Sequence, residues 1–186
     1  MMSVNKALFL DRDGVINVDH GYVSQKEQFE FINGIFELCN HAKAMNYMII
    51  IVTNQSGIGR GYYSQADFDV LTAWMSAEFA KQGISITQVY NCPHHPEKAE
   101  GDYKIDCQCR KPQPGMILQA AAEHHIDVTQ SVLIGDKMSD MKAAEAAGIP
   151  KRVLLNSLYN EGIDDFGLAS LRVASLSDIY IQDIFI

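Results

Sequence analysis

Two acidic residues follow a short apolar segment near the N-terminus. Asp11 and Asp13, separated by Arg12, come directly after the apolar residues 7–10. Ligands of open α/β sheets bind at the carboxyl ends of the strands. One carboxylate there could attack an electrophile while the other transfers a proton. A calcium loop is the alternative, but Tyr22 occupies the twelfth loop position, where an EF-hand needs Glu. The pair is therefore a candidate catalytic pair.

Two later apolar segments also end in polar residues. Residues 48–52 read as a buried strand and are followed by Thr53. A hydroxyl at this place, together with the backbone N–H groups after it, can bind phosphoryl oxygens. Residues 132–134 form a shorter apolar run that ends next to Asp136 and, farther on, Asp140. Since parallel strands end at one edge of a sheet, we expect these side chains to lie close to the first acidic pair.

A pair of cations completes the pattern. Arg110 and Lys111 precede a predicted helix whose first residue is expected at Pro114. The amino end of a helix is positive and favours anions, so the two cations would strengthen an anion site. Together, the four segments indicate a site for phosphoryl transfer.

These segments resemble the four motifs of the phosphatases of the haloacid dehalogenase (HAD) superfamily, and the resemblance covers nearly the whole chain. It implies that Asp11 is the nucleophile and Asp13 the general acid/base, with Thr53 and Lys111 stabilising the transferring group. Attack by a carboxylate on a phosphate ester brings two anions together, so a cation must offset the repulsion. The expected cofactor is Mg²⁺, held by Asp11, the carbonyl of Asp13, and Asp136.

Within the superfamily, the chain is most similar to a branch of sugar-bisphosphate phosphatases and next to the histidinol-phosphate phosphatases. The first resemblance implies removal of the 7-phosphate of a heptose 1,7-bisphosphate through an aspartyl-phosphate intermediate, in the synthesis of nucleotide-activated heptose for lipopolysaccharide. Histidinol phosphate stays the alternative substrate, although a second phosphate fits the available cations better. A catalytically inactive, zinc-stabilised binding protein is the alternative of another class, and the complete set of catalytic residues argues against it.

Substrate contacts are predicted in the loops around the site. Surface loops are expected to set selectivity, because no interval between the motifs has room for a separate cap domain. The side chains that flank the motifs could grip phosphate or sugar oxygens, and a solvated surface position is the alternative for each. The candidates are Asp19, His20, Gly21, Tyr22, Asn54, Gln55, Ser56, Arg60, Arg110 and Lys137.

A second cluster of reactive side chains lies in the middle of the chain. Cys92, His94, Cys107 and Cys109 offer three thiolates and one imidazole in two short pairs, which matches the ligands of a closed structural zinc site. The alternatives are a disulfide or simple burial, and His95 competes as the imidazole ligand. With four protein ligands no coordination position stays open, so this zinc would order the loop at about 91–110. It would thereby position the cations that follow.

Composition restricts the class of protein. The chain has 186 residues, 47% of them hydrophobic, and a formal net charge of −8. This acidity argues against a nucleic-acid surface. The apolar runs are too short for a membrane span, and no secretory leader is evident. We therefore expect one HAD domain over residues 1–186, monomeric and cytoplasmic, that acts on a small phosphorylated sugar.

Strand and helix patterns alternate along the chain, which predicts a three-layer, Rossmann-like α/β fold with a mostly parallel sheet and no cap. We expect a polar surface loop between residues 156 and 168 and a capped helix from about Ser175. Strands are predicted at 7–10, 48–52, 86–90, 132–134 and 152–155, and helices at 34–45, from Ser64 to near Gly83, at 115–125 and at 138–147.

Overall fold

Strands and helices alternate in the computed structural model, which describes residues 4–162, 167–179 and 184–185. The strands are β1 (Lys6–Leu10), β2 (Tyr47–Asn54), β3 (Ile86–Cys92), β4 (Val132–Gly135), β5 (Lys151–Leu155) and β6 (Leu171–Val173). The α-helices are α1 (Ile35–Ala44), α2 (Ser56–Gly59), α3 (Gln65–Lys81), α4 (Gly115–His124) and α5 (Met138–Ala147). Short 3₁₀ turns are found at Lys26–Gln28, Gly101–Tyr103, Val128–Gln130 and Leu176–Asp178.

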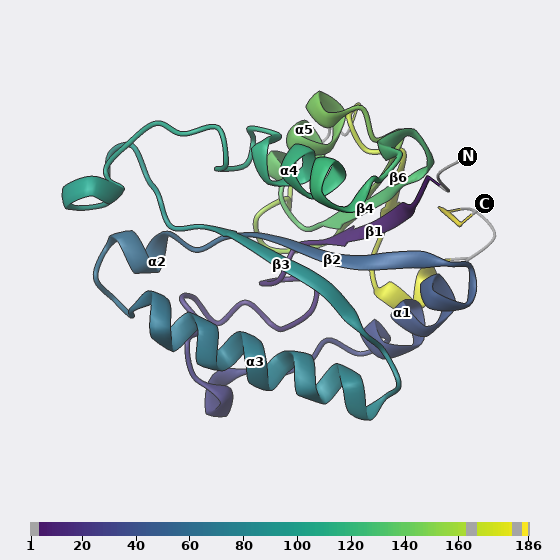
Figure 1. Ribbon diagram of the computed structural model, residues 1–186, viewed down its shortest axis with the longest axis horizontal. Helices are drawn as coiled ribbons and strands as arrows, with labels where there is room; N and C mark the ends of the chain where they lie inside the picture. Colours follow the sequence, from purple (N-terminus) through teal and green to yellow (C-terminus); the bar gives the residue numbers. More distant parts are fainter. Residues whose placement is uncertain (1–3, 163–166, 180–183, 186) are drawn as a thin grey trace.

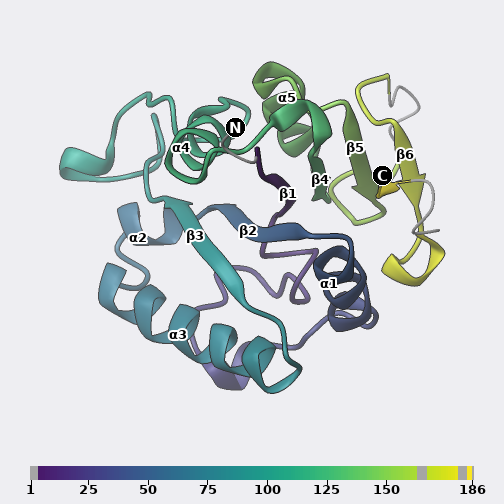
Figure 2. The same cartoon turned by 45° about the vertical axis from the view of Figure 1, so that its right-hand side comes forward.

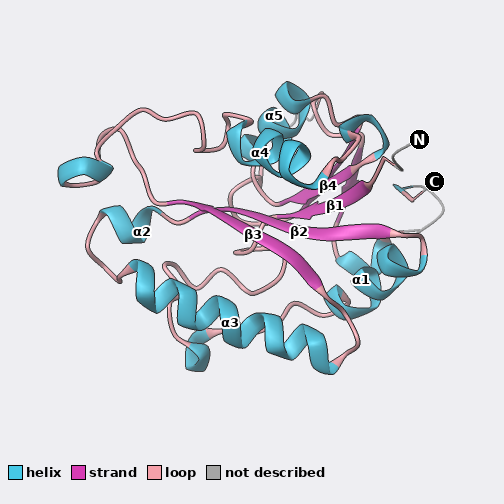
Figure 3. Ribbon diagram, in the orientation of Figure 1, coloured by secondary structure: helices cyan, strands magenta, loops and turns pink. Residues whose placement is uncertain are grey.

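The six strands form one parallel sheet in the order β3-β2-β1-β4-β5-β6 (Figures 1 and 3). β1 lies between β2 and β4, and its last residue, Leu10, is in register with Ile51 and Ile134. The strand order reverses on the two sides of β1, which is where open α/β sheets bind their ligands. The carboxyl ends of these three strands therefore meet at one edge of the sheet.

Helices cover both faces of the sheet. Leu8 and Leu10 of β1 pack into one core with side chains of α1 and α3, whereas Ala7 and Phe9 pack into a second core with α4 and α5. Figure 2 shows these two pairs of helices on opposite sides of the strands. Successive strand residues point to opposite faces, so a strand covered on both sides must be apolar throughout. The predicted three-layer α/β fold is confirmed.

Most predicted elements are present, with four differences. The short helix α2 was not predicted, because four residues are too few for a helical periodicity. β6 was not predicted, because three residues are too short for a periodic signal. Pro114 is the N-cap of α4 and not its first residue. The predicted C-terminal helix is a single 3₁₀ turn capped by Ser175, since the backbone at Ile179 is extended and buries that side chain in the core. The rest of that predicted helix lies mainly outside the described residues.

The intervals between the motifs contain no separate cap in the part of the chain that the structure describes. A loop, one 3₁₀ turn and α1 connect β1 to β2. After β3, residues 93–110 leave the body of the molecule as an extended loop and return to α4 (Figure 1). None of the helices among the described residues is both long and apolar enough to cross a membrane.

Candidate active site

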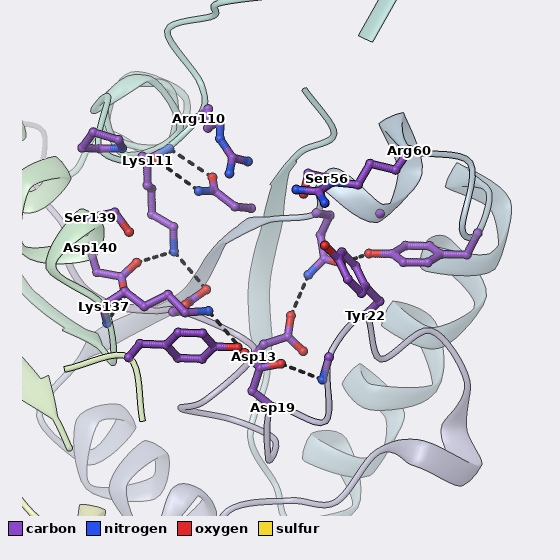
Figure 4. Close-up of a pocket in the computed structure, with 18 residues that line it drawn as sticks. Asp13, Asp19, Tyr22, Ser56, Arg60, Arg110, Lys111, Lys137, Ser139 and Asp140 are labelled. Atoms are coloured by element: carbon purple, nitrogen blue, oxygen red, sulfur yellow. Dashed lines mark hydrogen bonds and ion pairs between the residues drawn. The ribbon is translucent and has the colours of Figure 1, made fainter. Parts of the chain in front are cut away.

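The predicted catalytic residues meet at the carboxyl edge of the sheet. Asp11 follows β1, Thr53 lies near the end of β2, and Asp136 follows β4. A cavity of about 510 Å³ opens beside them, and Asp11, Asp13 and Lys111 line it (Figure 4). Four segments that are far apart in the sequence thus form one site.

Lys111 is a buried cation between two carboxylates. Its Nζ lies 2.9 Å from Asp11 Oδ1 and 2.6 Å from Asp140 Oδ1, and it also donates to the carbonyl of Val52 at 2.8 Å. Burial alone would lower the pKa of Lys111, but the charges of Asp11 and Asp140 outweigh it and raise that pKa. Burial raises the pKa of Asp11, and the Lys111 charge opposes this effect. Lys111 therefore remains charged and holds the predicted nucleophile.

Asp136 is a buried carboxylate without a donor. Neither of its oxygens has a hydrogen-bond partner among the described residues. Burial, followed by the charge of Asp11, raises its pKa to about 8. Gly14 leaves room for it, since a Cβ at that position would lie 2.3 Å from Asp136 Oδ2. A buried carboxylate that lacks hydrogen-bond donors is a suitable ligand for a metal ion.

Three carboxylates are close enough to share that ion. One oxygen each of Asp11, Asp136 and Asp140 lie within 4.8 Å of one another, and all three residues are buried. Asp140 was left outside the predicted metal set, which named Asp13 through its carbonyl. The structure brings the Asp140 carboxylate into the group of acids, where it also contacts Lys111.

Asp13 is held by three side chains. Arg12, only 1% exposed, donates from Nη2 to Oδ1 at 2.7 Å and to Oδ2 at 2.9 Å. Asn17 Nδ2 donates to Oδ1 at 3.0 Å. Gln55 Nε2 donates to Oδ2 at 2.9 Å. The predicted acid/base thus has one defined orientation at the edge of the cavity.

The polar side chains at the end of β2 contact other parts of the site. Asn54 exchanges two hydrogen bonds of 3.0 Å with the backbone of Lys111, so that it positions the lysine. Gln55 Nε2 also donates to Thr53 Oγ1 at 2.8 Å. Tyr63, which was not predicted, donates to Gln55 Oε1 at 2.5 Å, and burial raises its pKa to about 12. Asn54 and Gln55 therefore line the cavity with amides that already have partners.

One side of the cavity mouth is formed by Lys137, Asp19 and Tyr159. Lys137 Nζ lies 3.3 Å from Asp19 Oδ2 and 4.0 Å from the centroid of the Tyr159 ring. Burial would raise the pKa of Asp19, but Lys137 and hydrogen bonds from Gly21 and Tyr159 lower it. Tyr159 belongs to a segment predicted as plain surface loop, and no spacing signal in the sequence singles it out.

Tyr22, Ser56 and Arg60 lie on the other side of the mouth, whereas Arg110 lies beside Lys111, and all of them line the cavity (Figure 4). The Arg60 guanidinium lies over the Tyr22 ring, 5.5 Å from its centroid. Arg110 Nη1 donates to the backbone carbonyl of His94 at 3.2 Å, which connects this cation to the cysteine loop. Figure 4 shows cations on both sides of the opening.

His20 is the predicted contact that lies outside this cavity. Its exposed ring pairs with Glu30 at 3.3 Å and borders a different, smaller cavity of about 320 Å³. The chain turns at Gly21, whose φ is +78°. The His20 side chain therefore points away from the active-site cavity, while the Tyr22 side chain lies at the cavity mouth.

The cysteine loop brings its four predicted ligands together. Cys92 Sγ lies 2.8 Å from Cys109 Sγ and 3.5 Å from Cys107 Sγ, and His94 Nδ1 lies 3.3 Å from Cys109 Sγ. All four cysteines of the chain are free thiols. His95 accepts from two backbone N–H groups of its own loop instead. The arrangement could hold a tetrahedral metal ion, with His94 as the imidazole ligand.

Comparisons with known proteins agree with this geometry. A family model described as HAD-hydrolase-like matches residues 108–180. The D-glycero-beta-D-manno-heptose-1,7-bisphosphate 7-phosphatase of Haemophilus influenzae is 47% identical over 173 residues, which cover 90% of this chain and 94% of that protein. The corresponding alpha-named phosphatase of Burkholderia mallei is 54% identical over 151 residues, covering 81% of this chain and 80% of that protein. The chain belongs to the heptose-1,7-bisphosphate 7-phosphatase family of HAD-like hydrolases.

A solved relative shares the fold. The D,D-heptose 1,7-bisphosphate phosphatase of B. bronchiseptica, complexed with magnesium and phosphate, superposes with a TM-score of 0.77 at 26% identity, over 92% of this chain and 94% of that one. The predicted HAD phosphatase is thus confirmed, and a phosphoric monoester hydrolase is supported over the inactive binding protein. Family membership also supports the sugar bisphosphate over histidinol phosphate.

Proposed function

We propose that this chain hydrolyses the 7-phosphate of D-glycero-D-manno-heptose 1,7-bisphosphate to the 1-phosphate, as a step toward nucleotide-activated heptose for lipopolysaccharide. The observation that carries this substrate is the set of cations around the cavity, Arg60, Arg110 and Lys137, in a chain that belongs to this phosphatase family. Guanidinium groups pair well with a second phosphate, which a monophosphate substrate lacks.

The reaction follows from the positions of the acidic residues. Asp11 attacks phosphorus while Lys111 balances the negative charge, and Asp13 protonates the oxygen that leaves. Asp13 then takes a proton from the water that hydrolyses the aspartyl phosphate. The hydroxyl of Thr53 supports the transferring group. Mg²⁺ held by Asp11, Asp136 and the carbonyl of Asp13 would supply the positive charge that brings the two anions together.

Further contacts and cofactors belong to the same proposal. Some of the predicted substrate contacts have side chains at the mouth of the cavity and are therefore well placed to bind the sugar bisphosphate. These are Asp19, Tyr22, Ser56, Arg60, Arg110 and Lys137. A structural zinc ion in the cysteine loop would fix Arg110 and Lys111. We expect the protein to act as a cytoplasmic, single-domain monomer, without nucleic acid or membrane partners.

The test compares substrates on one preparation with Mg²⁺ present. We expect kcat/KM for either anomer of heptose 1,7-bisphosphate to exceed that for histidinol phosphate or heptose 7-phosphate by at least about 100-fold, since a lost charge-assisted contact costs several kcal/mol. Asp11→Asn should abolish phosphate release, whereas Asp69→Asn, on the exposed face of α3, should not. A preference for histidinol phosphate would overturn the proposed substrate.

A further inference from the structure

Tyr63, which is partly buried, and Gln55, which is buried, form a hydrogen-bonded pair beside the predicted general acid, and both line the cavity. Tyr63 lies just before the N-cap of α3, and its hydroxyl donates to Gln55 Oε1 at 2.5 Å. Gln55 is only 2% exposed. The ring of Tyr63 packs against Gly57, where a Cβ would lie 2.3 Å from ring atom Cε1. The position of the hydroxyl is therefore fixed by packing as well as by its hydrogen bond.

This contact decides which end of the Gln55 amide faces the reacting groups. The oxygen accepts from Tyr63, so the nitrogen points the other way and donates to Asp13 Oδ2 at 2.9 Å and to Thr53 Oγ1 at 2.8 Å. If the amide were turned over, its oxygen would face the oxygens of Asp13 and Thr53. A hydroxyl that donates to the amide oxygen makes that orientation unfavourable, because the partly buried Tyr63 hydroxyl would lose its acceptor.

The two oxygens of Asp13 are held differently. Oδ1 accepts from Arg12 Nη2 at 2.7 Å and from Asn17 Nδ2 at 3.0 Å, on the side of the N-terminal loop. Oδ2 accepts from Arg12 Nη2 at 2.9 Å and from Gln55 Nε2, and Gln55 lines the cavity. Gln55 is thus the donor to Asp13 that comes from the end of β2 and not from the N-terminal loop (Figure 4).

We propose that Gln55 and Tyr63 are positioning residues for the proton transfer from Asp13 to the leaving oxygen. The proposal rests on the HAD phosphatase chemistry given above, but not on the identity of the sugar. As the bond from Asp11 to phosphorus forms, the bond from phosphorus to the leaving oxygen breaks, and the proton of the Asp13 carboxyl moves to that oxygen. The resulting carboxylate accepts from Gln55 and Arg12. This positioning role comes in addition to the predicted role of Gln55 as a substrate contact.

Leaving groups distinguish this role from a general structural one. An alkoxide or phenolate needs the proton from Asp13, whereas p-nitrophenolate is stable enough to leave with little help. The value of kcat/KM reports the steps up to the formation of the aspartyl phosphate. A residue that positions the acid should therefore matter more for the poorer leaving group.

The experiment measures kcat/KM for p-nitrophenyl phosphate, phenyl phosphate and heptose 1,7-bisphosphate. For Tyr63→Phe we expect a loss of about threefold with the nitrophenyl ester and tenfold or more with the other two, a fraction of the full acid effect of roughly 10²–10⁴. Gln55→Glu, which keeps an acceptor for Tyr63 and removes the donor to Asp13, should show the same pattern. Equal losses on all three substrates would overturn the proposal.

Tyr90→Phe is the matched control. The Tyr90 ring is also buried, and its hydroxyl donates to a carboxylate, that of Glu123, at 2.5 Å, away from the cavity. This variant should keep the wild-type values, and thermal melting checks that all variants fold. Wild-type protein that hydrolyses both aryl esters but not the heptose bisphosphate would overturn the proposed substrate and leave the Tyr63 comparison intact.

Discussion

The buried carboxylates of the site differ in whether a neighbouring cation offsets their negative charge. Lys111 offsets the charges of Asp11 and Asp140, which it contacts directly. Asp136 has no such partner among the described residues. An unpaired buried carboxylate is costly and either takes up a proton or binds a cation. We therefore expect Mg²⁺ binding at this site to depend on pH.

We predict that Mg²⁺ stabilises the protein more as pH rises. In the metal-free protein the pKa of Asp136 is raised by burial from 3.8 to about 8. Because the folded-state pKa of Asp136 lies above its unfolded-state value, the contribution of this group to the free energy of unfolding is complete below pH 3.8. That contribution is lost as the pH rises toward 8. Mg²⁺ needs the ionised form, so the increase in Tm on adding it should be roughly 5 °C larger at pH 8.5 than at pH 6.

Asp136→Asn is the control for this measurement. The amide does not ionise, so the difference between the two pH values should shrink to about the error of the melt. A wild-type increase in Tm that is the same at both pH values would contradict the coupling.

At the scale of elements, the segment after β5 supports the site from behind. Asn160 is fully buried, and its Nδ2 donates to the carbonyls of Asp136 at 2.7 Å and Leu155 at 2.8 Å. Ser157 Oγ donates to the same Asp136 carbonyl at 2.9 Å. The adjacent Tyr159 lines the cavity mouth. One short segment thus fixes the backbone of a metal-site acid and contributes to the opening.

We predict that Asn160→Ala lowers the free energy of unfolding by about 2 kcal/mol, because two buried carbonyls lose a donor. It should also weaken Mg²⁺ binding, since the Asp136 backbone is no longer held. Urea unfolding and Mg²⁺ titration measure the two effects. Asn156→Ala, whose exposed side chain accepts from Arg172 at 2.6 Å, is the matched control and should change each far less. A loss of stability with unaltered Mg²⁺ affinity would contradict the positioning role.

The cysteine loop is the second element that acts at a distance. Its proposed zinc ligand Cys109 is followed at once by Arg110 and Lys111, and Arg110 donates to the carbonyl of His94. The backbone of Lys111 is in turn held by Asn54. Ordering of the loop should therefore be transmitted to both cations.

We predict that Cys107→Ser, or removal of zinc by a chelator, lowers kcat/KM by about tenfold or more, because the cations are displaced by fractions of an ångström. Metal analysis must show the loss of zinc in the same sample, with Mg²⁺ restored before the assay. Cys39→Ala, on the buried face of α1 and away from the cysteine loop, should keep both zinc and activity. Unchanged turnover after a verified loss of zinc would refute the link.

For the whole molecule, the central strand is buried on both faces. Leu8 and Phe9 are both fully buried but belong to different cores, one on each side of the sheet. The site lies at the end of this strand, so the two cores together hold its position.

We predict that Leu8→Ala and Phe9→Ala each lower the free energy of unfolding by about 3 kcal/mol, because each opens a cavity in one of the two cores. Val70→Ala, whose side chain on α3 is 72% exposed, should cost less than about 0.5 kcal/mol. Urea unfolding followed by circular dichroism measures all three. A small effect at either strand position would contradict burial on both faces.

The sequence predicts those features that depend on neighbouring residues. The N-cap Ser64 and the bounds of α5 follow from local patterns, and the structure has them as expected; it adds that Asp67 completes a capping box with Ser64. Short apolar runs identify β1, β2 and β4. The four motifs and the cysteine loop carry residue types whose chemistry is specific, so candidates for the nucleophile, the acid/base and the metal ligands could be named from the sequence. The structure brings these candidates together, and their roles stay predictions.

Some roles depend on hydrogen-bond partners that are distant in sequence or on the orientation of a side-chain amide. The spacing of residue types along the sequence indicates neither of these. This is the case for Asn54, Gln55, Tyr63 and Tyr159. The choice between His94 and His95 is likewise decided by how the loop folds back on itself. The sequence by itself thus determines the layered fold and the candidate residues for catalysis and for zinc, because these follow from local patterns of residue types. Only the tertiary structure decides which side chains share a hydrogen bond, since burial and orientation arise when separate strands end at the same edge of the sheet.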